Sequence, residues 1–300
     1  MKLIVNFHVI DDHNIGDRLS APVEYFDFPG FETIKADIRK IDDFINAYQD
    51  KLTLYDRVVF IIGGGGLLFS RFLDSFQKLK IICPKATLIA WGIGQQIYLN
   101  QSLLTPKEFP YGDYLEGFDM IGIRDYEQDY SWVPCASCLH PLFDLKREIK
   151  HEFVVFSHKK FQLHINGLPR ITNDSSSFQE VLDFLGSGET ILTSSYHGAY
   201  WGTLLGRKVL AFPFSSKFYT LKHSPGLYPI QQWTQFSRKI TLFSKTLYQK
   251  YDKNKFTCSI KEWKAELKNC QFYPHSLREC RDQNKLYYAQ LLEFLQGSST

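Results

Sequence analysis

The stretch Val58-Val-Phe-Ile-Ile62-Gly-Gly-Gly-Gly66-Leu-Leu-Phe-Ser-Arg-Phe-Leu73 joins an apolar run to a helical pattern through four glycines. A short, continuously apolar run that ends at glycine is typical of a strand buried on both faces of a parallel sheet. Glycines before a helix let the backbone approach a ligand, and the helix N-terminus offers free N–H groups to an anion. We therefore predict a strand–turn–helix unit whose turn, with Gly64 and Gly65 at its centre, binds phosphate or carboxylate. No Gly-Lys-Ser/Thr sequence follows the glycines, so the stretch is not a P-loop.

Apolar runs and helical patterns alternate on both sides of this stretch. The predicted strands are 2–7, 32–36, 57–62, 87–91, 120–123, 153–157, 190–193 and 208–212, and the predicted helices are 40–49, 67–80, 176–185, 197–205 and one within 274–295. Strands that alternate with helices indicate parallel sheets covered on both faces. We expect an α/β fold with two Rossmann-like domains, residues 1–147 and 148–300, a cleft between them and a C-terminal helix. Such clefts bind ligands at the carboxyl ends of the strands.

Composition narrows the class of protein. The chain has 300 residues, of which 44% are hydrophobic, enough for two domains of ordinary size. It has no apolar run of transmembrane length, and its first residues lack the apolar region of a signal peptide, so we expect a cytoplasmic protein. Cys135, Cys138 and His140 are spaced like zinc ligands, but no second pair at ligand spacing completes a site. We predict no metal.

The positive charge is small but unevenly distributed. A formal net charge of +3 is too mild to indicate a nucleic-acid partner. Between Arg238 and Lys268, however, Lys and Arg far outnumber Asp and Glu, and aromatic residues lie between them. Two interpretations stay open. The composition favours a solvated face whose aromatic residues belong to the core, and the alternative is a surface that meets anionic lipid headgroups.

Polar residues follow several of the predicted strands in the first half. Arg124 ends the strand 120–123, where its guanidinium can bind a carboxylate or phosphate in the cleft, and a local ion pair with Asp125 is the alternative. Gly94 belongs to another glycine-rich strand exit. Asn14 and Asp17 follow the first strand, either as a helix cap or as contacts to a sugar hydroxyl. We predict that Arg124 binds an anion and that Asn14, Asp17 and Gly94 contact a second ligand, the sugar acceptor.

A histidine follows a predicted strand in the second half. His197 comes after the strand 190–193 and at the start of the next helix, where it can act as a general acid or base. The positive end of that helix lowers the pKa of an imidazole. Gly198 lets a ligand or the opposite sheet approach, and Lys217 leaves the strand 208–212 on the same side. A structural histidine, serving as a cap or as core filler, is the alternative.

Together, these segments resemble the polysaccharide pyruvyl transferase family. The matching segments are Asn14-Ile-Gly-Asp17, Gly63–Gly66, Trp91-Gly-Ile-Gly94, Ile123-Arg124-Asp125, Ser194-Ser-Tyr-His-Gly198, Phe214-Ser-Ser-Lys217 and Ser276-Leu-Arg-Glu-Cys-Arg-Asp-Gln-Asn284. They occur in order over nearly the whole chain. Residues 133–144 resemble the subgroup that decorates bacterial exopolysaccharides, including the xanthan-type ketal pyruvyl transferases.

The resemblance implies a fold similar to GT-B glycosyltransferases and a reaction without a cofactor. Phosphoenolpyruvate is the implied donor, a sugar with two nearby hydroxyls is the implied acceptor, and a cyclic pyruvate ketal and phosphate are the products. His197 is the implied catalytic acid/base. The implied donor-binding residues are Arg124, Lys217, Ser194, Ser195, Gly198, Gly64 and Gly65. Many members carry arginine two residues before the histidine, and this chain has Ser195 there.

Two other functions remain open. A glycosyltransferase of the same architecture would use glycine-rich strand exits and a cationic site for a nucleotide-sugar diphosphate. A glycan-binding or assembly subunit without catalysis is the second alternative, and Ser195 motivates it. For the pyruvyl transferase we expect a lipid-linked sugar acceptor, no nucleic-acid partner, and a position at the inner face of the cytoplasmic membrane, with residues 238–268 as the contact.

Overall fold

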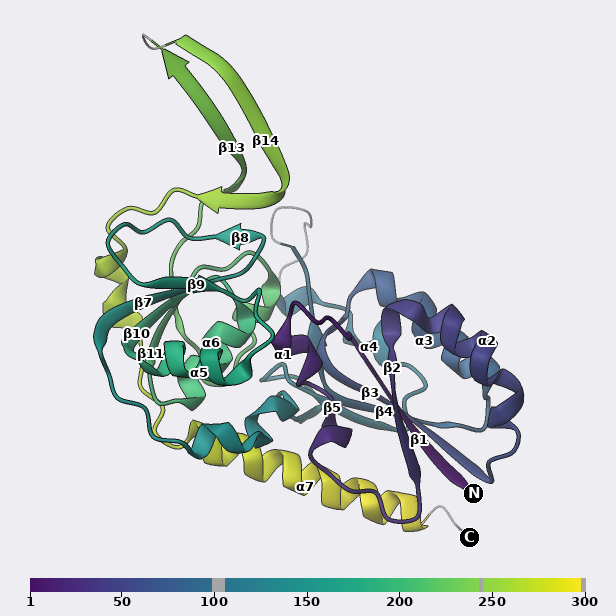
Figure 1. Ribbon diagram of the computed structural model, residues 1–300. Helices are drawn as coiled ribbons and strands as arrows, with labels where there is room; N and C mark the ends of the chain where they lie inside the picture. Colours follow the sequence, from purple (N-terminus) through teal and green to yellow (C-terminus); the bar gives the residue numbers. More distant parts are fainter. Residues whose placement is uncertain (99–105, 243–244, 298–300) are drawn as a thin grey trace.

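The computed structural model describes residues 1–98, 106–242 and 245–297, and for residues 237–242, 245–251 and 253 it describes the backbone alone. Two parallel sheets form the body of the molecule (Figure 1). The first has the order β2-β1-β3-β4-β5-β6, with β1 (Lys2–His8), β2 (Glu32–Asp37), β3 (Arg57–Leu68), β4 (Thr87–Gln95), β5 (Met120–Ile123) and β6 (Ser131–Trp132). The second has the order β12-β11-β10-β7-β9, with β7 (His151–Ser157), β9 (Arg170–Thr172), β10 (Gly188–Thr193), β11 (Lys208–Ala211) and β12 (Gly226–Leu227). The predicted α/β fold with two Rossmann-like sheets is confirmed.

The first sheet is covered on both faces. In β1, Leu3, Val5 and Phe7 join the core on the side of α2 (Ile41–Leu52) and α3 (Ser70–Ile82), while Ile4 joins a separate core on the other side. Successive side chains of a strand point to opposite faces, so a continuously apolar strand supplies both cores.

The C-terminal helix α7 (Ser276–Gly297) covers that other face of the first sheet (Figure 1). Tyr287 donates a hydrogen bond to the carbonyl of Ala90 (2.7 Å), and the indole of Trp91 donates to Asn284 (2.9 Å). The helix was predicted as an element, but we grouped it with residues 148–300. Its later side chains Tyr287, Leu291 and Leu295 pack on the first sheet, whereas Cys280 belongs to the core of the second half, so the helix joins both halves. Helical periodicity does not reveal such long-range pairing.

The helices of the second sheet are α5 (Phe178–Gly186) and α6 (Tyr196–Leu204). Every residue of α6 is buried, and its glycines let it lie close to the strands. A Cβ atom at Gly198 would lie 2.4 Å from Thr193 Oγ1 and 2.5 Å from the Phe156 ring. The prediction that Gly198 admits a ligand is therefore wrong, because helix-to-sheet packing fills the space beside it.

The four glycines of the opening stretch belong to a strand. β3 continues through them to Leu68, pairs with β4 at Gly63 and Gly65, and α3 begins only at Ser70. Gly64 and Gly65 have φ angles of +80° and +93°, which favour glycine strongly. The prediction that a helix N-terminus lies beside the glycines is therefore wrong. Because glycine has no Cβ atom, these residues instead leave space for neighbouring groups.

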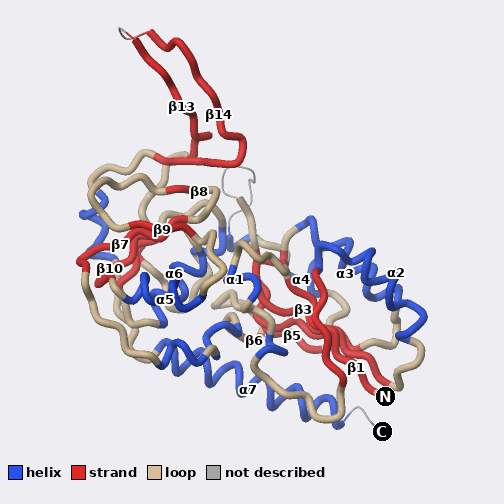
Figure 2. The backbone as a smooth tube through the Cα atoms, viewed as in Figure 1, coloured by secondary structure: helices blue, strands red, loops and turns tan. Residues whose placement is uncertain are grey.

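A third, smaller sheet joins β8 (Phe161–Gln162) to the antiparallel hairpin of β13 (Trp233–Leu242) and β14 (Lys245–Cys258). The hairpin extends away from the second sheet (Figures 1 and 2). Most of the basic side chains of the segment 238–268 lie in this hairpin, outside the side chains that are described.

The remaining elements are short. They are α1 (Ile15–Arg18), α4 (Tyr111–Leu115) and the 3₁₀ turns Pro22–Glu24, Ile38–Lys40, Pro106–Glu108, Ala136–Leu139, Pro141–Asp144, Ser216–Phe218 and Trp263–Asn269. Among the residues with described structure, no helix combines the length and the apolar character needed to cross a membrane.

Candidate functional site

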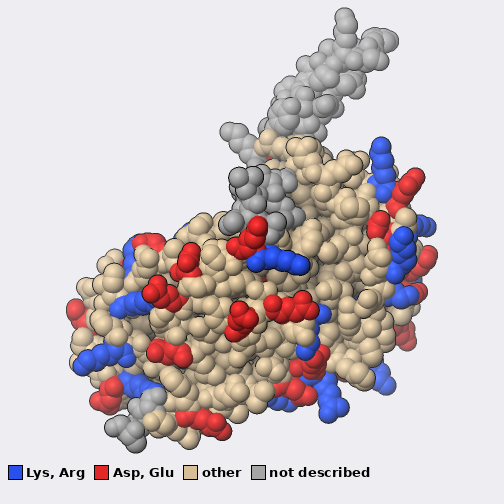
Figure 3. All heavy atoms as spheres, turned by 180° about the vertical axis from the view of Figure 1, so that it is seen from behind, with Lys and Arg blue, Asp and Glu red and all other residues tan. Residues whose placement is uncertain are grey.

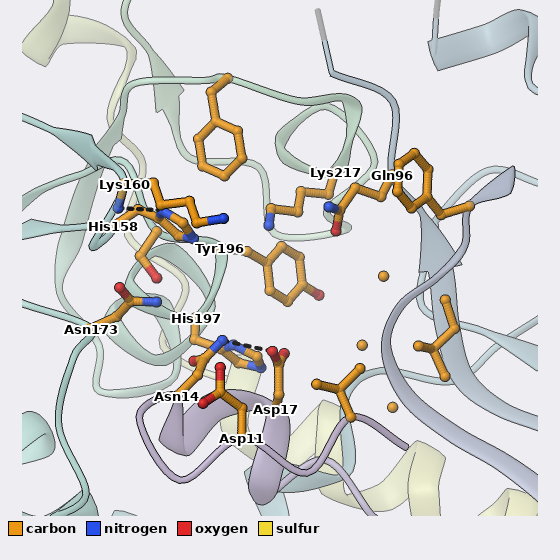
Figure 4. A pocket seen from close by; sticks show the side chains of 18 of the residues that line it. Asp11, Asn14, Asp17, Gln96, His158, Lys160, Asn173, Tyr196, His197 and Lys217 are labelled. Atoms are coloured by element: carbon orange, nitrogen blue, oxygen red, sulfur yellow. Dashed lines mark hydrogen bonds between the residues drawn. The ribbon is translucent and has the colours of Figure 1, made fainter. Parts of the chain in front are cut away.

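A cavity of about 220 Å³ lies where the carboxyl ends of the two sheets meet. The residues that line it follow β1, β3, β4 and β5 on one side and β7, β9, β10 and β11 on the other. Figure 4 shows Asp11, Asn14 and Asp17 at one edge, His158, Lys160 and Asn173 at a second, Gln96 and Lys217 at a third, and Tyr196 and His197 between them. The cleft expected between two parallel sheets is therefore a polar cavity built by both halves of the chain.

Arg124 is the most unusual charged group in the cavity. It is only 4% exposed, and within the described part of the chain its Nε and Nη2 atoms have no hydrogen-bond partner. Its guanidinium carbon lies 4.0 Å from the ring centre of Tyr196. A buried charged group with unused donors is energetically unfavourable unless a ligand pairs with it. Arg124 is therefore positioned to bind an anion.

Asp125 and Arg124 do not form an ion pair among the described side chains, and Arg124 Nε and Nη2 make no hydrogen bond to it. Its carboxylate accepts hydrogen bonds from the Gln95 N–H (2.7 Å), the Tyr111 hydroxyl (3.0 Å) and the Thr220 hydroxyl (2.6 Å). Asp125 thus ties together β4, α4 and a loop of the second half. The alternative of a local ion pair is not what the structure shows.

Gly94 does not line the cavity, and its lack of a side chain leaves space for Arg124. A Cβ atom at Gly94 would lie 2.6 Å from Arg124 Nε and 2.8 Å from the Asp125 carboxylate. The prediction that Gly94 contacts an acceptor is wrong, because the pairing of β4 with β5 places these two side chains against it.

Lys217 supplies a second positive charge. It lies in the 3₁₀ turn Ser216–Phe218, which the first half of the chain holds through the backbone of Ile97 and Ser216 (2.8 Å). Lys217 Nζ is 4.8 Å from the ring centre of Phe214 and 6.0 Å from that of Tyr196. Burial, and then the charge of Arg124, lowers the pKa of Lys217 to about 7. Lys217 is therefore poised to gain or lose a proton near neutral pH.

His197 lies in the first turn of α6, as predicted. Ser195 caps this helix by accepting a hydrogen bond from the Gly198 N–H (3.4 Å). The imidazole is 7% exposed, Nε2 is 3.8 Å from the thiol of Cys135, and a Cβ atom at Gly16 would lie 2.1 Å from Nδ1. Burial, and then the charges of Arg124 and Lys217, holds the pKa of His197 well below its usual range. Without an anion in the cavity, His197 is neutral.

Asn14 and Asp17 line the cavity beside His197 (Figure 4). Asn14 donates a hydrogen bond to Asp17 (2.6 Å) and does not cap α1 with its side chain, so the alternative of a helix cap is wrong. Burial raises the pKa of Asp17, while Lys217 and Arg124 oppose that shift. Asp17 is an acid whose protonation responds to the charge in the cavity.

Ser194 and Ser195 differ in position. Ser195 lines the cavity, as do Gly64 and Gly65, but Ser194 does not. The Ser194 hydroxyl accepts a hydrogen bond from the His158 N–H (2.9 Å) and donates to the Phe161 carbonyl (2.5 Å). The prediction that Ser194 binds the donor is wrong, because its hydroxyl is already bonded to two backbone groups, one in the loop after β7 and one in β8.

Several cavity residues were missed at the sequence level. His158, Lys159 and Lys160 directly follow the predicted strand 153–157, so the strand-end rule that found Arg124 could have found them. Burial, and then the charge of Lys217, holds the pKa of His158 well below its usual range. Tyr196 packs against Arg124, and no sequence signal distinguishes it from a core tyrosine.

Positive charge dominates the cavity wall. Its cationic residues are Arg39, Arg71, Arg124, Lys159, Lys160 and Lys217, and its acidic residues are Asp11 and Asp17. Arg39 pairs with Asp37, and Lys159 pairs with Asp11 (3.1 Å). On the face opposite to the view of Figure 1, acidic and basic side chains are interspersed (Figure 3). The excess of positive charge in a confined cavity attracts anions.

No group of three potential metal ligands occurs within the described ranges. Cys135 and Cys138 are both fully buried. The Cys135 thiol faces Ser137 (3.2 Å) and His197, and the His140 ring accepts a hydrogen bond from the Leu142 N–H (3.2 Å). Cys135, Cys138 and His140 thus contact other residues of the protein.

Comparison with known proteins adds little. No family model matches the sequence, and no curated protein matches it. Among solved structures, the chain is similar to a functionally uncharacterized protein from Klebsiella pneumoniae, with 15% sequence identity and a TM-score of 0.40, over 71% of this chain and 83% of that chain. A similarity of this size identifies no ligand, so the function has to be argued from the residues of the cavity.

Proposed function

We propose that this protein transfers pyruvate from phosphoenolpyruvate to two hydroxyls of a sugar, in a polysaccharide or its lipid-linked repeat unit. The observation that carries the proposal is the buried guanidinium of Arg124, whose Nε and Nη2 lack partners among the described residues and which shares a cavity with Lys217 and His197. Phosphoenolpyruvate carries a carboxylate and a phosphate close together. Arginine binds either group through paired hydrogen bonds, and lysine adds a point charge.

The size of the cavity also supports a small donor. Its volume of about 220 Å³ is below the roughly 300–1,000 Å³ of pockets that hold drug-sized ligands. Phosphoenolpyruvate is far smaller than a nucleotide sugar. This difference in size favours the pyruvyl transferase over the glycosyltransferase.

In the proposed mechanism, binding of the donor prepares His197 as an acid. The positive charges of Arg124 and Lys217 contribute to keeping His197 neutral in the empty cavity. A bound carboxylate and phosphate offset these charges, so the imidazole takes up a proton when the donor binds. Protonated His197 then transfers a proton to the methylene carbon of phosphoenolpyruvate, which becomes a methyl group.

The acceptor reacts at the carbon that protonation activates. The first sugar hydroxyl forms a C–O bond to this carbon, phosphate leaves as its C–O bond breaks, and the second hydroxyl closes the ketal. One hydroxyl proton restores His197, and the other leaves with phosphate. Asp17, with a raised pKa and a place beside His197, is suited to accept a hydroxyl proton on the way. Arg124 and Lys217 stabilise the charge on the departing phosphate.

The position of Lys217 answers the difficulty raised by Ser195. Many polysaccharide pyruvyl transferases, the family that the chain resembles, have arginine two residues before the histidine. In this chain Ser195 occupies that position and caps α6. Lys217 comes from another strand end to the same cavity and places its ammonium group near Tyr196. A second cation at this point supports an active enzyme over a glycan-binding subunit without catalysis.

The test is mass spectrometry of the surface glycan of the host, with the gene intact, deleted, and complemented by wild type or His197→Gln. We expect the intact strain to carry an added mass of one pyruvate less one water per ketal, and deletion to remove it. Wild type should restore the ketal and His197→Gln should not. A glycan of unchanged mass after deletion, or full restoration by His197→Gln, would contradict the proposal. Loss of a whole sugar would favour the glycosyltransferase.

A further inference from the structure

A chain of buried side chains runs from the core of the second half to the catalytic histidine. The Trp201 indole donates a hydrogen bond to the Ser137 hydroxyl (3.0 Å), which lies 3.2 Å from the Cys135 thiol. That thiol lies 3.8 Å from His197 Nε2. Trp201, Ser137 and Cys135 are each at most 1% exposed, so water does not complete their hydrogen bonds.

The donor and acceptor roles along this chain follow from its first member. An indole N–H can only donate, so the Ser137 oxygen accepts from Trp201. Within the described residues, the hydrogen of the Ser137 hydroxyl has a single acceptor, the sulfur of Cys135. The hydrogen of the Cys135 thiol is then left for Nε2 of His197. Burial raises the pKa of Cys135, so the thiol keeps that hydrogen at neutral pH.

The reverse order leaves a buried group unsatisfied. If Nε2 carried the hydrogen and donated to sulfur, either the thiol hydrogen or the Ser137 hydroxyl hydrogen would lack an acceptor among the described residues. Buried polar groups are almost always hydrogen-bonded, so the first order is favoured.

We propose that Trp201, Ser137 and Cys135 fix neutral His197 in the tautomer with its hydrogen on Nδ1, which makes Cys135 a positioning residue. Nε2 faces Cys135, which does not line the cavity. Nδ1 lies beside Gly16, between the cavity residues Asn14 and Asp17 along the chain. The nitrogen of this cavity residue that does not face Cys135 thus carries an N–H donor.

This tautomer suits His197 both to bind an anion and to act as an acid. Nδ1 carries a hydrogen in both the neutral and the protonated ring, so an anion meets a donor in either state. The same nitrogen has no free lone pair, so in the empty cavity His197 cannot act as a base through Nδ1. The role of that anion as the donor phosphate rests on the proposed function, whereas the tautomer itself does not.

The experiment measures the tautomer directly in the free protein. The two ring nitrogens of ¹⁵N-labelled histidine differ in chemical shift according to which carries the hydrogen, and comparison with His197→Gln assigns the signals. At about pH 8 the imidazole is neutral. We expect wild type to have the hydrogen on Nδ1, Cys135→Ala to shift the population toward Nε2, and Cys135→Ser to restore Nδ1 because a hydroxyl also donates.

Two results would overturn the proposal. A wild-type protein with the hydrogen on Nε2 contradicts it without any variant, so a poorly folded Cys135→Ala does not prevent the test. A folded Cys135→Ala with an unchanged tautomer contradicts it as well. Cys83→Ala, at a half-buried thiol directly after the C-terminal end of α3, is the matched control and should leave the signals unchanged.

Sulfate binding gives a second measurement that a merely structural cysteine would not affect. We expect Cys135→Ala to weaken sulfate binding by about two- to tenfold, the effect of one net hydrogen bond, and Cys135→Ser to recover most of it. Equal weakening by both variants would overturn the positioning role. Neither measurement uses phosphoenolpyruvate, so failure here and failure of the proposed function are distinguishable.

Discussion

The two walls of the cavity hold positive charge in different ways. On the wall of the first sheet, the buried guanidinium of Arg124 carries the charge, and a Cβ atom at Gly65 would meet only Asp17 Oδ1, at 4.0 Å. On the wall of the second sheet, His158, His197 and Lys217 all have lowered pKa values because they are buried near positive charge. We infer from this difference that the first wall holds an anion through a fixed anchor, the guanidinium of Arg124. The side chains of the second wall, the titrating wall, take up protons when the anion binds.

The largest expected effect comes from the titrating wall. His197→Gln removes the group that gives up the proton but keeps a polar side chain of similar size. We expect turnover of phosphoenolpyruvate to fall about 10²–10⁴-fold with the fold intact, the usual contribution of a general acid. Phosphate release in a coupled assay measures it. His151→Gln, at the exposed amino end of β7, is the control, and near-normal turnover of His197→Gln would assign the acid elsewhere.

Arg124→Lys tests the fixed anchor. The substitution keeps the charge and removes the paired donors Nε and Nη2, so we expect sulfate and phosphoenolpyruvate to bind about 10- to 100-fold more weakly, the effect of one hydrogen bond to a charged group. Isothermal titration calorimetry measures the affinity. Arg278→Lys, at an exposed position of α7, should bind normally. Unchanged affinity of Arg124→Lys would mean that the guanidinium donors do not face the ligand.

Lys217 should make anion binding depend on pH. Its pKa is about 7 in the empty cavity and rises when an anion binds, so binding takes up a proton above that pH. Sulfate keeps its charge across this range, and we expect its affinity to fall by up to about tenfold per pH unit above 7. Lys217→Met should reduce this slope to the part that His197 contributes. An unchanged slope in Lys217→Met would assign the proton to another group, such as His158.

The same shift affects the empty protein. The folded-state pKa of Lys217 lies below its value of 10.5 in the unfolded chain, so the unfolded chain binds more protons between these two values. Lys217 therefore destabilises the empty protein fully below about pH 7, and this penalty fades as the pH rises toward 10.5.

Gly94→Ala separates the shape of the first wall from its charge. The added methyl group would lie 2.6 Å from Arg124 Nε, so the guanidinium has to move. We expect a loss of about 1–3 kcal/mol in the free energy of unfolding, as for other overpacked sites, together with weaker sulfate binding. Urea denaturation measures the first. At Gly112 a Cβ atom meets nothing within 4 Å, so Gly112→Ala should do neither, and equal effects of the two variants would contradict the close fit at Gly94.

The smallest expected effect concerns the hairpin that extends the second wall. At its base the Phe256 ring lies 5.1 Å from Phe161, which stacks at 3.9 Å on the cavity residue Phe214. If the basic hairpin contacts anionic lipid, replacing Lys239 by Gln should weaken binding to phosphatidylserine vesicles by about 1 kcal/mol. Cosedimentation measures this, and binding should vanish at high salt. Equal binding to neutral vesicles would contradict a role for charge.

Sequence reasoning found the cavity because strand ends of parallel sheets meet, which is a property of the fold class. Arg124, His197 and Lys217 each follow a recognisable apolar strand, and the structure brings all three together. The same expectation, that residues at strand ends contact a ligand, was wrong for Gly94 and Gly198. Side chains from other elements of the fold pack against these two glycines instead.

The remaining errors have the same physical origin. Whether a glycine faces a ligand or a packed neighbour depends on strand pairing and on side chains far along the chain, as at Gly94, where a Cβ atom would collide with Arg124. The hydroxyl of Ser194 is likewise bonded to backbone groups more than thirty residues away in sequence. Local patterns do not carry such contacts.

The central claim is that the anchor and the titrating wall together bind phosphoenolpyruvate. Calorimetric titration at about pH 8, in two buffers with different enthalpies of ionisation, measures both binding and proton uptake. The account predicts one phosphoenolpyruvate per chain, proton uptake that Lys217→Met reduces, and much weaker binding to Arg124→Lys. Absence of binding, or binding that neither substitution alters, would contradict it.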